Sequence, residues 1–387
     1  MNSRERLLVA LNHREPDRVP IDLGGTPTST ISARAHENLK AHLGIQSPTR
    51  MMSPIFLTAY PDKEIVRRFG VDVKMVTANP PAEFELHPTP EGKIGDEWGV
   101  VYQWNEEAQT HFVVEREAPL HRVTTPEEVE KHPWPDPTDP SRYRGLKETA
   151  RRHQQEGYAV VVSTPLLVMT QTQGMRGLEQ FMVDTVLNPS LLEYMMDKIL
   201  GIQLQMTRHL LEEIDPYIDV IVIGDDLSHQ GGLTYSPDMY RRLFKPRHRK
   251  IMRVLKEEFG DAKVLYHCCG GVESLLPDLI DLGIDAINPV QVSAKGMGDT
   301  KKLKAKYGRH LTFWGGIDTQ RILPFGTPAE VRNEVRSRIE DLVKMADLSL
   351  APCTTSARRS SRKISVLCMR RLWNMENIRN RKCSFRP

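Results

Sequence analysis

The sequence is poor in cysteine and in aromatic residues, with five cysteines and 6% aromatics among 387 residues. So few cysteines, two of them adjacent, do not form the disulfide framework of a small secreted protein. Long apolar runs are missing too, because the longest, near residues 159–169, is interrupted by Ser163, Thr164 and Pro165 and is too short to span a bilayer. The first residues are charged throughout and lack the pattern of a signal peptide. We therefore expect a soluble cytoplasmic protein with no membrane partner.

Most of the chain also lacks a large excess of charge of either sign. The formal net charge is +3, but residues 346–387 hold ten Lys or Arg and two acidic residues, a net of +8, which leaves −5 for the residues before them. A mildly acidic body argues against a nucleic-acid-binding surface. We expect no nucleic-acid partner.

The most informative stretch is residues 263–291, KVLYHCCGGVESLLPDLIDLGIDAINPVQ. A short apolar strand at 264–266 runs into His-Cys-Cys-Gly-Gly, and an apolar helical pattern then ends at Gly283 before the next strand at 284–290. Such a tight β-α-β unit predicts a parallel sheet, whose ligands bind beyond the carboxyl ends of the strands. The polar residues at those ends are His267, Cys269, Asn288 and Gln291.

His267 and Cys269 are candidate zinc ligands. Side chains alternate along an extended chain, so these two point the same way and Cys268 points the opposite way. Imidazole and thiolate are both common zinc ligands. Two ligands alone also fit a structural histidine and two buried thiols beside a glycine turn, and this alternative stays open.

The order of elements favours a large α/β domain. Seven candidate parallel strands begin near residues 19, 71, 158, 219, 264, 284 and 311, with helices between most of them. A (β/α)8 TIM barrel needs an eighth strand, which would follow Lys344. An open doubly wound sheet is the competing architecture, but no glycine-rich dinucleotide fingerprint supports it. Alternating residues at about 80–119 predict a β-hairpin insertion.

Polar residues at other strand ends are further candidates. Asp225 and Asp226 end the strand that begins near 219, where they could be catalytic acids or bases or could cap the next loop. The helix over 240–248 is rich in charge, and we expect most of its face to be solvated. The remaining candidates could bind substrate or serve as core, cap or solvated loop residues: Asp22, His229, Asn288, Gln291, Trp314 and Asp318.

Several blocks carry a resemblance to a known family. They are the opening NSRERLLVALNHREPDRVPIDLGG, then GDDLSHQGGLTYSPDMYRRLFKPRHRKI, YHCCGGVESLLPDLIDLGIDAINPVQ and LTFWGGIDTQRILPFGTP. Over most of residues 1–345 the chain resembles the uroporphyrinogen decarboxylase (URO-D) superfamily. The resemblance implies a (β/α)8 barrel. That superfamily contains the uroporphyrinogen decarboxylases of haem synthesis and cobalamin-dependent methyltransferases that use zinc.

The resemblance is closer to the methyltransferase branch. True decarboxylases carry an N-terminal arginine-rich motif for substrate carboxylates, and the matching residues 20–30 contain no arginine. The methyltransferases carry His-x-Cys-Gly where this chain has His267-Cys268-Cys269-Gly270. Their third ligand is a cysteine near the last strand. The resemblance therefore implies zinc on His267 and Cys269, with Cys353 as the third ligand if residues 348–353 pair as a substitute strand.

We therefore predict a zinc-dependent methyltransferase that transfers a methyl group to or from a corrinoid (cobalamin). Its expected partners are a small-molecule methyl donor or acceptor and, as a candidate, a corrinoid carrier protein. The first alternative is uroporphyrinogen decarboxylase-like decarboxylation of a tetrapyrrole, which needs no metal.

The end of the chain departs from the family. Residues 346–387 contain no glycine, although the chain has 25, and they hold three of the five cysteines without any periodicity. Family members continue there with a glycine-rich strand. We interpret 346–387 as an aberrant basic tail, either disordered or, as we favour, produced by a frameshift. Disruption of the eighth strand and its helix leaves a further alternative, an inactive truncated-barrel product.

Overall fold

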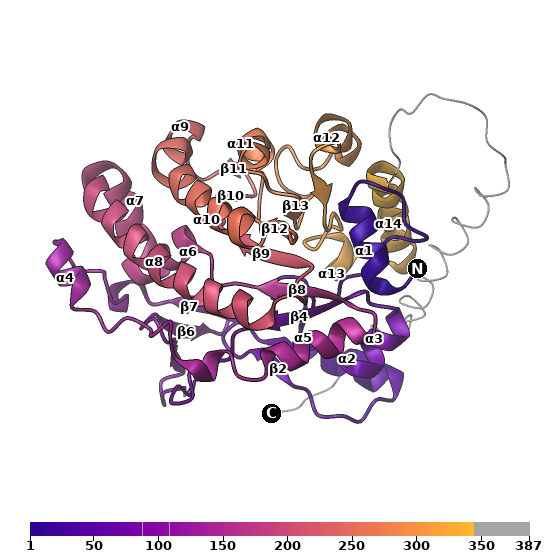
Figure 1. Cartoon of the computed structure of the whole chain (residues 1–387), viewed down its shortest axis with the longest axis horizontal. Coiled ribbons are helices and arrows are strands. Elements are labelled where there is room, and N and C mark those ends of the chain that lie inside the picture. Colours follow the sequence, from indigo (N-terminus) through magenta and orange to yellow (C-terminus); the bar gives the residue numbers. More distant parts are fainter. Residues whose placement is uncertain (87, 108, 344–387) are drawn as a thin grey trace.

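The computed structural model describes residues 1–86, 88–107 and 109–343. Its centre is a parallel six-stranded sheet in which the strands are neighbours in the order β14-β13-β12-β9-β8-β4 (Figure 1). The strands are β4 (Val73–Thr77), β8 (Ala159–Ser163), β9 (Val220–Gly224), β12 (Lys263–His267), β13 (Ala286–Asn288) and β14 (Thr312–Phe313).

The spatial order of these strands follows their order in the sequence. A doubly wound sheet reverses direction at a switch point, whereas a barrel adds each strand beside the last. The fold is therefore the predicted α/β, TIM-barrel-like fold, with β4 and β14 as the two edges of the described sheet. The eighth strand expected after Lys344 lies outside the described residues.

The two faces of the sheet are buried against different partners. Val160 and Val162 of β8 belong to a large cluster with the surrounding helices, whereas Ala159 and Val161 belong to a second cluster with neighbouring strands. Leu7 of the first helix also joins this second cluster. Alternate strand residues thus fill an interior and support an outer helical layer, as in a barrel.

The helices alternate with these strands. Ser236 caps α9, Asp299 caps α12, and Gly70 ends α3 in the left-handed region with φ 64°. None of the helices in the described ranges is both long and apolar enough to cross a membrane. The α-helices are α1 (Ser3–Leu11), α2 (Ala33–Leu43), α3 (Lys63–Phe69), α4 (Pro126–Glu130), α5 (Leu146–Gln155), α6 (Val168–Arg176), α7 (Leu178–Leu187), α8 (Pro189–Ile214), α9 (Pro237–Met239), α10 (Lys245–Glu258), α11 (Leu276–Asp281), α12 (Thr300–Tyr307), α13 (Ile322–Phe325) and α14 (Pro328–Val343).

The expected first strand near residue 19 is wrong, because the structure assigns no strand there. The amide of Ile21 donates to the side chain of Asp72, at 2.8 Å from Oδ2, and the Ile21 carbonyl accepts one bond from the Asp72 amide at 2.8 Å. Pro20 has no N–H to offer a sheet, and Gly24 turns the chain with φ 82°. The segment nevertheless runs beside the start of β4.

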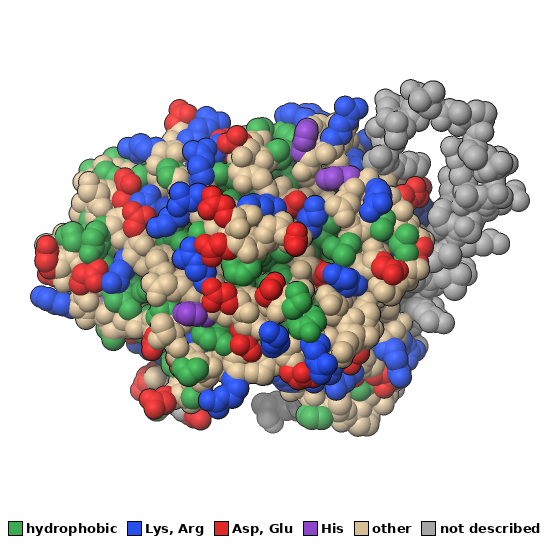
Figure 2. Space-filling model, viewed as in Figure 1, with side chains coloured by type: hydrophobic (Ala, Val, Ile, Leu, Met, Phe, Trp, Pro, Cys, Tyr) green, Lys and Arg blue, Asp and Glu red, His purple; other side chains and the backbone are tan. Residues whose placement is uncertain are grey.

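The smaller sheets are antiparallel. β5 (Lys93–Gly95), β6 (Val101–Asn105) and β7 (Thr110–Val113) form three strands where a hairpin was expected. The others are β1 (Ile31–Ser32), β2 (Met51–Ser53) and β3 (Thr58–Ala59) in one sheet, and β10 (Ser228–His229) and β11 (Gly232–Leu233) in another. On the face shown in Figure 2, acidic and basic side chains are intermingled. The division into a barrel over 1–345 and a tail stays a prediction, since residues 344–387 lie outside the described ranges.

Candidate metal centre

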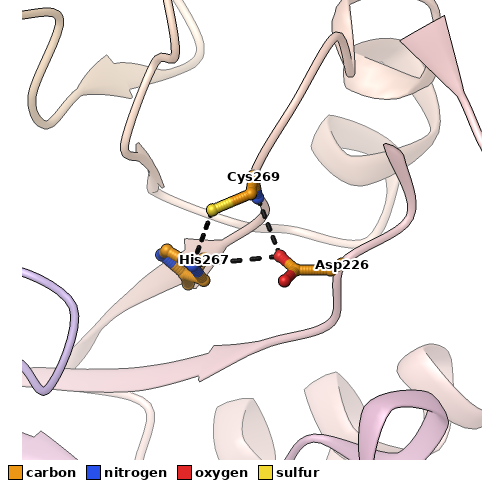
Figure 3. Close-up of side chains that lie close together, drawn as sticks. All are labelled: Asp226, His267 and Cys269. Atoms are coloured by element: carbon orange, nitrogen blue, oxygen red, sulfur yellow. Dashed lines mark hydrogen bonds and ion pairs between the residues drawn. The ribbon is translucent and has the colours of Figure 1, made fainter. Parts of the chain in front are cut away.

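Three potential metal ligands meet where β9 and β12 end. His267 is the last residue of β12 and is paired with Gly224, while Asp226 and Cys269 follow the two strands. One ligand atom from each of Asp226, His267 and Cys269 lies within 4.8 Å of the others. His267 Nε2 is 3.5 Å from Cys269 Sγ and 3.9 Å from Asp226 Oδ1, and Figure 3 shows the three side chains turned toward one another.

Glycine lets the two strand ends approach this closely. A Cβ at Gly224 would lie 2.4 Å from the carbonyl oxygen of His267, so any other residue would push the strands apart. Gly270 has φ 92°, and a Cβ there would lie 2.6 Å from the backbone nitrogen of His229. Both glycines therefore have a packing reason, and Gly270 has a conformational one as well.

The imidazole of His267 is oriented by Asn288. His267 Nδ1 lies 2.7 Å from Asn288 Oδ1, while Asn288 Nδ2 donates to the Trp314 carbonyl at 3.0 Å. The bond to the Trp314 carbonyl fixes which way the Asn288 amide faces, so Oδ1 is turned toward His267. Nδ1 of His267 therefore carries the proton and donates a hydrogen bond to Asn288 Oδ1. Nε2 then carries a lone pair directed at Cys269 and Asp226. Metal-binding histidines are usually oriented in this way, through a hydrogen bond from the other ring nitrogen.

The thiol of Cys269 is partly buried beside a carboxylate. Burial, and then the negative charge of Asp226, raise the pKa of Cys269 to about 12. The backbone amide of Cys269 donates to Asp226 Oδ1 at 2.8 Å, which places that carboxylate next to the thiol. A cation between them would favour the thiolate and reverse the direction of this pKa shift.

Cys268 points elsewhere, as expected from alternation. It is buried, with Sγ 3.6 Å from Ser228 Oγ, and burial raises the pKa of its thiol to about 12. Gln291 Oε1 accepts from the Gly270 amide at 2.8 Å and so supports the loop that carries Cys269. The exposed His229 uses Nδ1 to accept from the Gly231 amide at 3.0 Å.

Asp225 does not face the three ligands. Its carboxylate is buried and accepts bonds from the amides of Met169 and Thr170, at 3.0 and 2.8 Å, and lies 3.0 Å from His248 Nε2. The helix expected to be solvated at 240–248 in fact buries His248, which the sequence reasoning missed. The signal that could have found it is the helical spacing of buried apolar residues around it, Tyr240, Phe244, Ile251 and Leu255.

Asp22, Trp314 and Asp318 lie at the same end of the sheet. Trp314 Nε1 donates to Asp22 Oδ2 at 2.9 Å, and burial raises the pKa of Asp22. The same Trp314 holds Asn288 through its carbonyl, so a chain of contacts leads from Asp22 to His267. Asp318 instead accepts from the amides of two residues that follow it, at 2.8 and 2.9 Å, and caps its own turn.

The comparisons with known proteins decide the family. The family model for uroporphyrinogen decarboxylase (URO-D) matches residues 112–347, which is more than half of the chain. The chain belongs to the URO-D family. This confirms the resemblance of its sequence blocks to that superfamily. No curated protein matches in a sequence comparison.

A solved structure supports the same fold for this URO-D family chain. The chain is similar to a methyltransferase from Methanosarcina mazei, with a TM-score of 0.60 and 18% sequence identity over 96% of this chain and 99% of that chain. At this identity the likeness shows the fold, and it agrees with the strand order described above.

The residues of this URO-D family chain fit a zinc ion. Imidazole nitrogen, thiolate sulfur and carboxylate oxygen are the three ligand types that zinc takes in proteins, and three protein ligands leave room for a substrate. Asp226, expected as a catalytic acid or base, is the third candidate ligand among the described residues. Cys353, the expected third ligand, lies outside them.

Proposed function

We propose that this chain is a zinc-dependent methyltransferase that transfers a methyl group to or from a corrinoid. The observation that carries the proposal is the convergence of His267, Cys269 and Asp226 at the carboxyl ends of β9 and β12. Membership of the URO-D family and the shared fold with a methyltransferase support it. The small-molecule partner would be a thiol or a methylated compound.

The bound zinc would supply a Lewis acid that keeps a substrate thiol as the nucleophilic thiolate at neutral pH. The protein's own residues prepare the site for it. Asn288 keeps the proton on Nδ1 of His267, so that Nε2 is free to bind. Cys269 gives up its thiol proton when it binds. The side chain of Asp226 is 49% exposed, so this carboxylate is within reach of a substrate from solvent.

Decarboxylation of a tetrapyrrole is the second candidate, because the family model carries that name. A substrate with many carboxylates needs cationic partners. Three arginines near the start of the chain are already engaged: Arg6 and Arg18 pair with the buried Asp72, and Arg4 pairs with Asp219. Asp72 and Asp219 come just before β4 and β9, at the opposite end of the sheet from the candidate centre. This placement favours the methyltransferase.

The first experiment is elemental analysis of zinc in the purified chain and in His267→Ala, Cys269→Ala and Asp226→Ala. We expect about one zinc per chain in the wild type and loss in the variants, since each removes one ligand. His229→Ala is the matched control, because His229 lies in the neighbouring loop and its ring accepts from the Gly231 amide of its own turn. The second experiment follows demethylation of methylcobalamin by added thiols through its visible absorbance.

A folded wild-type chain without zinc would contradict the proposal and favour the decarboxylase. A zinc-containing chain that leaves methylcobalamin unchanged with every thiol tested would contradict the methyl-transfer part alone.

A further inference from the structure

A buried polar network lies directly behind the candidate metal centre. The side chains of Asp225 and His248 are 0% and 2% exposed, and His248 Nε2 lies 3.0 Å from Asp225 Oδ2. Burying two such groups is costly unless their hydrogen bonds are satisfied. Asp225 satisfies its carboxylate with the amides of Met169 and Thr170, in the first turn of α6, as well as with His248. A negative charge at a helix N-terminus is also electrostatically favourable.

The same residue is tied to the metal ligands through the backbone. The amide of Asp225 donates to the carbonyl oxygen of His267 at 3.1 Å. The next residue, Asp226, turns its carboxylate to the other side, toward Cys269. The Asp226 carboxylate accepts a hydrogen bond from the Cys269 amide. Because residues 225 and 226 are adjacent in the chain, the position of Asp226 depends on where residue 225 is held.

His248 is itself held from its other side. Its Nδ1 lies 3.3 Å from the hydroxyl of Tyr240, and its ring packs edge-on against Tyr266, with ring centroids 5.6 Å apart. Tyr240 opens a π-helical segment, Tyr240–Phe244, between α9 and α10. Such segments interrupt a regular helix and are frequent at functional sites. Tyr240 and His248 meet within the core although seven residues lie between them in the chain.

We propose that His248 is a positioning residue for the candidate metal centre. It holds Asp225 against α6 and the His267 backbone, and thereby keeps the Asp226 carboxylate within reach of a metal on His267 and Cys269. The inference rests on the proposed function, in that the centre must bind a metal. Tyr240 completes the arrangement by fixing the ring of His248.

The test compares His248→Leu with His248→Gln in the full chain. Leucine removes the donor to Asp225, whereas the glutamine amide reaches the position of Nε2 and restores it. Zinc affinity is measured by competition with a chelator, and the visible spectrum of the Co²⁺-loaded protein reports the ligand geometry. Substitutions that disturb the support of metal ligands weaken binding by about 10- to 100-fold. We expect a loss at the lower end of this range and an altered Co²⁺ spectrum in His248→Leu, and recovery of both in His248→Gln.

A merely structural role for His248 would lower stability without changing the Co²⁺ spectrum. Thr300→Val is the control for lost stability, because it removes a buried hydroxyl that bonds to Asp341 and Arg338, away from the centre. If His248→Leu does not fold, Tyr240→Phe takes its place, and we expect a smaller loss of affinity in the same direction.

The outcomes separate the two proposals. A metal-binding wild type whose affinity and spectrum are unchanged by His248→Leu, or by Tyr240→Phe where the leucine variant does not fold, overturns the inference alone. A wild type that binds neither zinc nor Co²⁺ overturns the proposed function and this inference with it.

Discussion

The Nδ1 atom of His267 lies 2.7 Å from Oδ1 of Asn288, and this contact selects which imidazole nitrogen is free. We predict that Asn288→Leu weakens zinc binding by about 10- to 100-fold, since the imidazole loses both its preferred tautomer and its orientation. Chelator competition measures the change. Thr28→Val is the control, because it removes a longer contact of 3.3 Å to the same oxygen and leaves the His267 bond intact. Equal zinc affinity in Asn288→Leu and Thr28→Val would contradict the assigned role.

The thiol of Cys269 gives a second prediction, for the metal-free protein. Its pKa is raised to about 12 by burial and by the charge of Asp226, so only a small fraction is thiolate at neutral pH. Asp226→Asn removes that charge and should lower the pKa, so alkylation of Cys269 by iodoacetamide should become faster. Peptide mass spectrometry follows each cysteine separately. Burial is the largest cause of the raised pKa of the Cys268 thiol, and the charge of Asp226 adds less, so Cys268 is the internal control and should stay slow.

A change at Cys268 as large as that at Cys269 would mean that Asp226→Asn loosens the loop rather than changing the local charge. No change at either would show that the carboxylate has little effect on the thiol.

The sequence predicted the elements whose signals are local. The strand that runs into His267 follows from a short apolar run, and it is confirmed. The segment near residue 19 has the same apolar start, but its bonds go to the side chain of Asp72, which is distant in the sequence. No local pattern could reveal that partner, so the strand was predicted wrongly.

The candidate site divides in the same way. His267 and Cys269 could be proposed from spacing alone, because alternation along a strand places both on one side. Asp226 joins them only because β9 lies beside β12 in the sheet, a long-range pairing. His248 was missed because its neighbours in the sequence are charged, although its ring faces the core.

A third prediction concerns acid stability. Burial, and then the nearby charge of Lys74, lower the pKa of His153 from 6.5 to about 4. The unfolded chain therefore binds a proton at this residue in a pH range where the folded chain does not, and stability falls as the pH drops from about 6.5 to about 4. His153→Gln cannot gain that proton. Its melting temperature should fall less than that of the wild type between about pH 7.5 and about pH 5.

Differential scanning calorimetry at both pH values measures this difference. His42→Gln is the matched control, because His42 is exposed on α2 and should leave the pH dependence unchanged. An equal drop in melting temperature for His153→Gln and the wild type would place the acid sensitivity elsewhere.

The last prediction concerns how the first segment is joined to the edge of the sheet. Trp314 follows β14, and its indole Nε1 donates to Asp22 Oδ2 at 2.9 Å, while Asp22 Oδ1 accepts from the Gly25 amide at 2.8 Å. Trp314→Phe keeps an aromatic ring but leaves the Asp22 oxygen without its donor, at a cost of about 1–3 kcal/mol. Urea unfolding measures this loss.

In an Asp22→Ala background, the same Trp314→Phe change should cost less, because no carboxylate is left unpaired. The difference between the two costs is the coupling free energy of the pair. Independent, additive effects would mean that this bond does not hold the segment against the sheet. The Trp314 carbonyl bonds to Asn288 in either variant, so zinc affinity should stay close to that of the wild type even where stability falls.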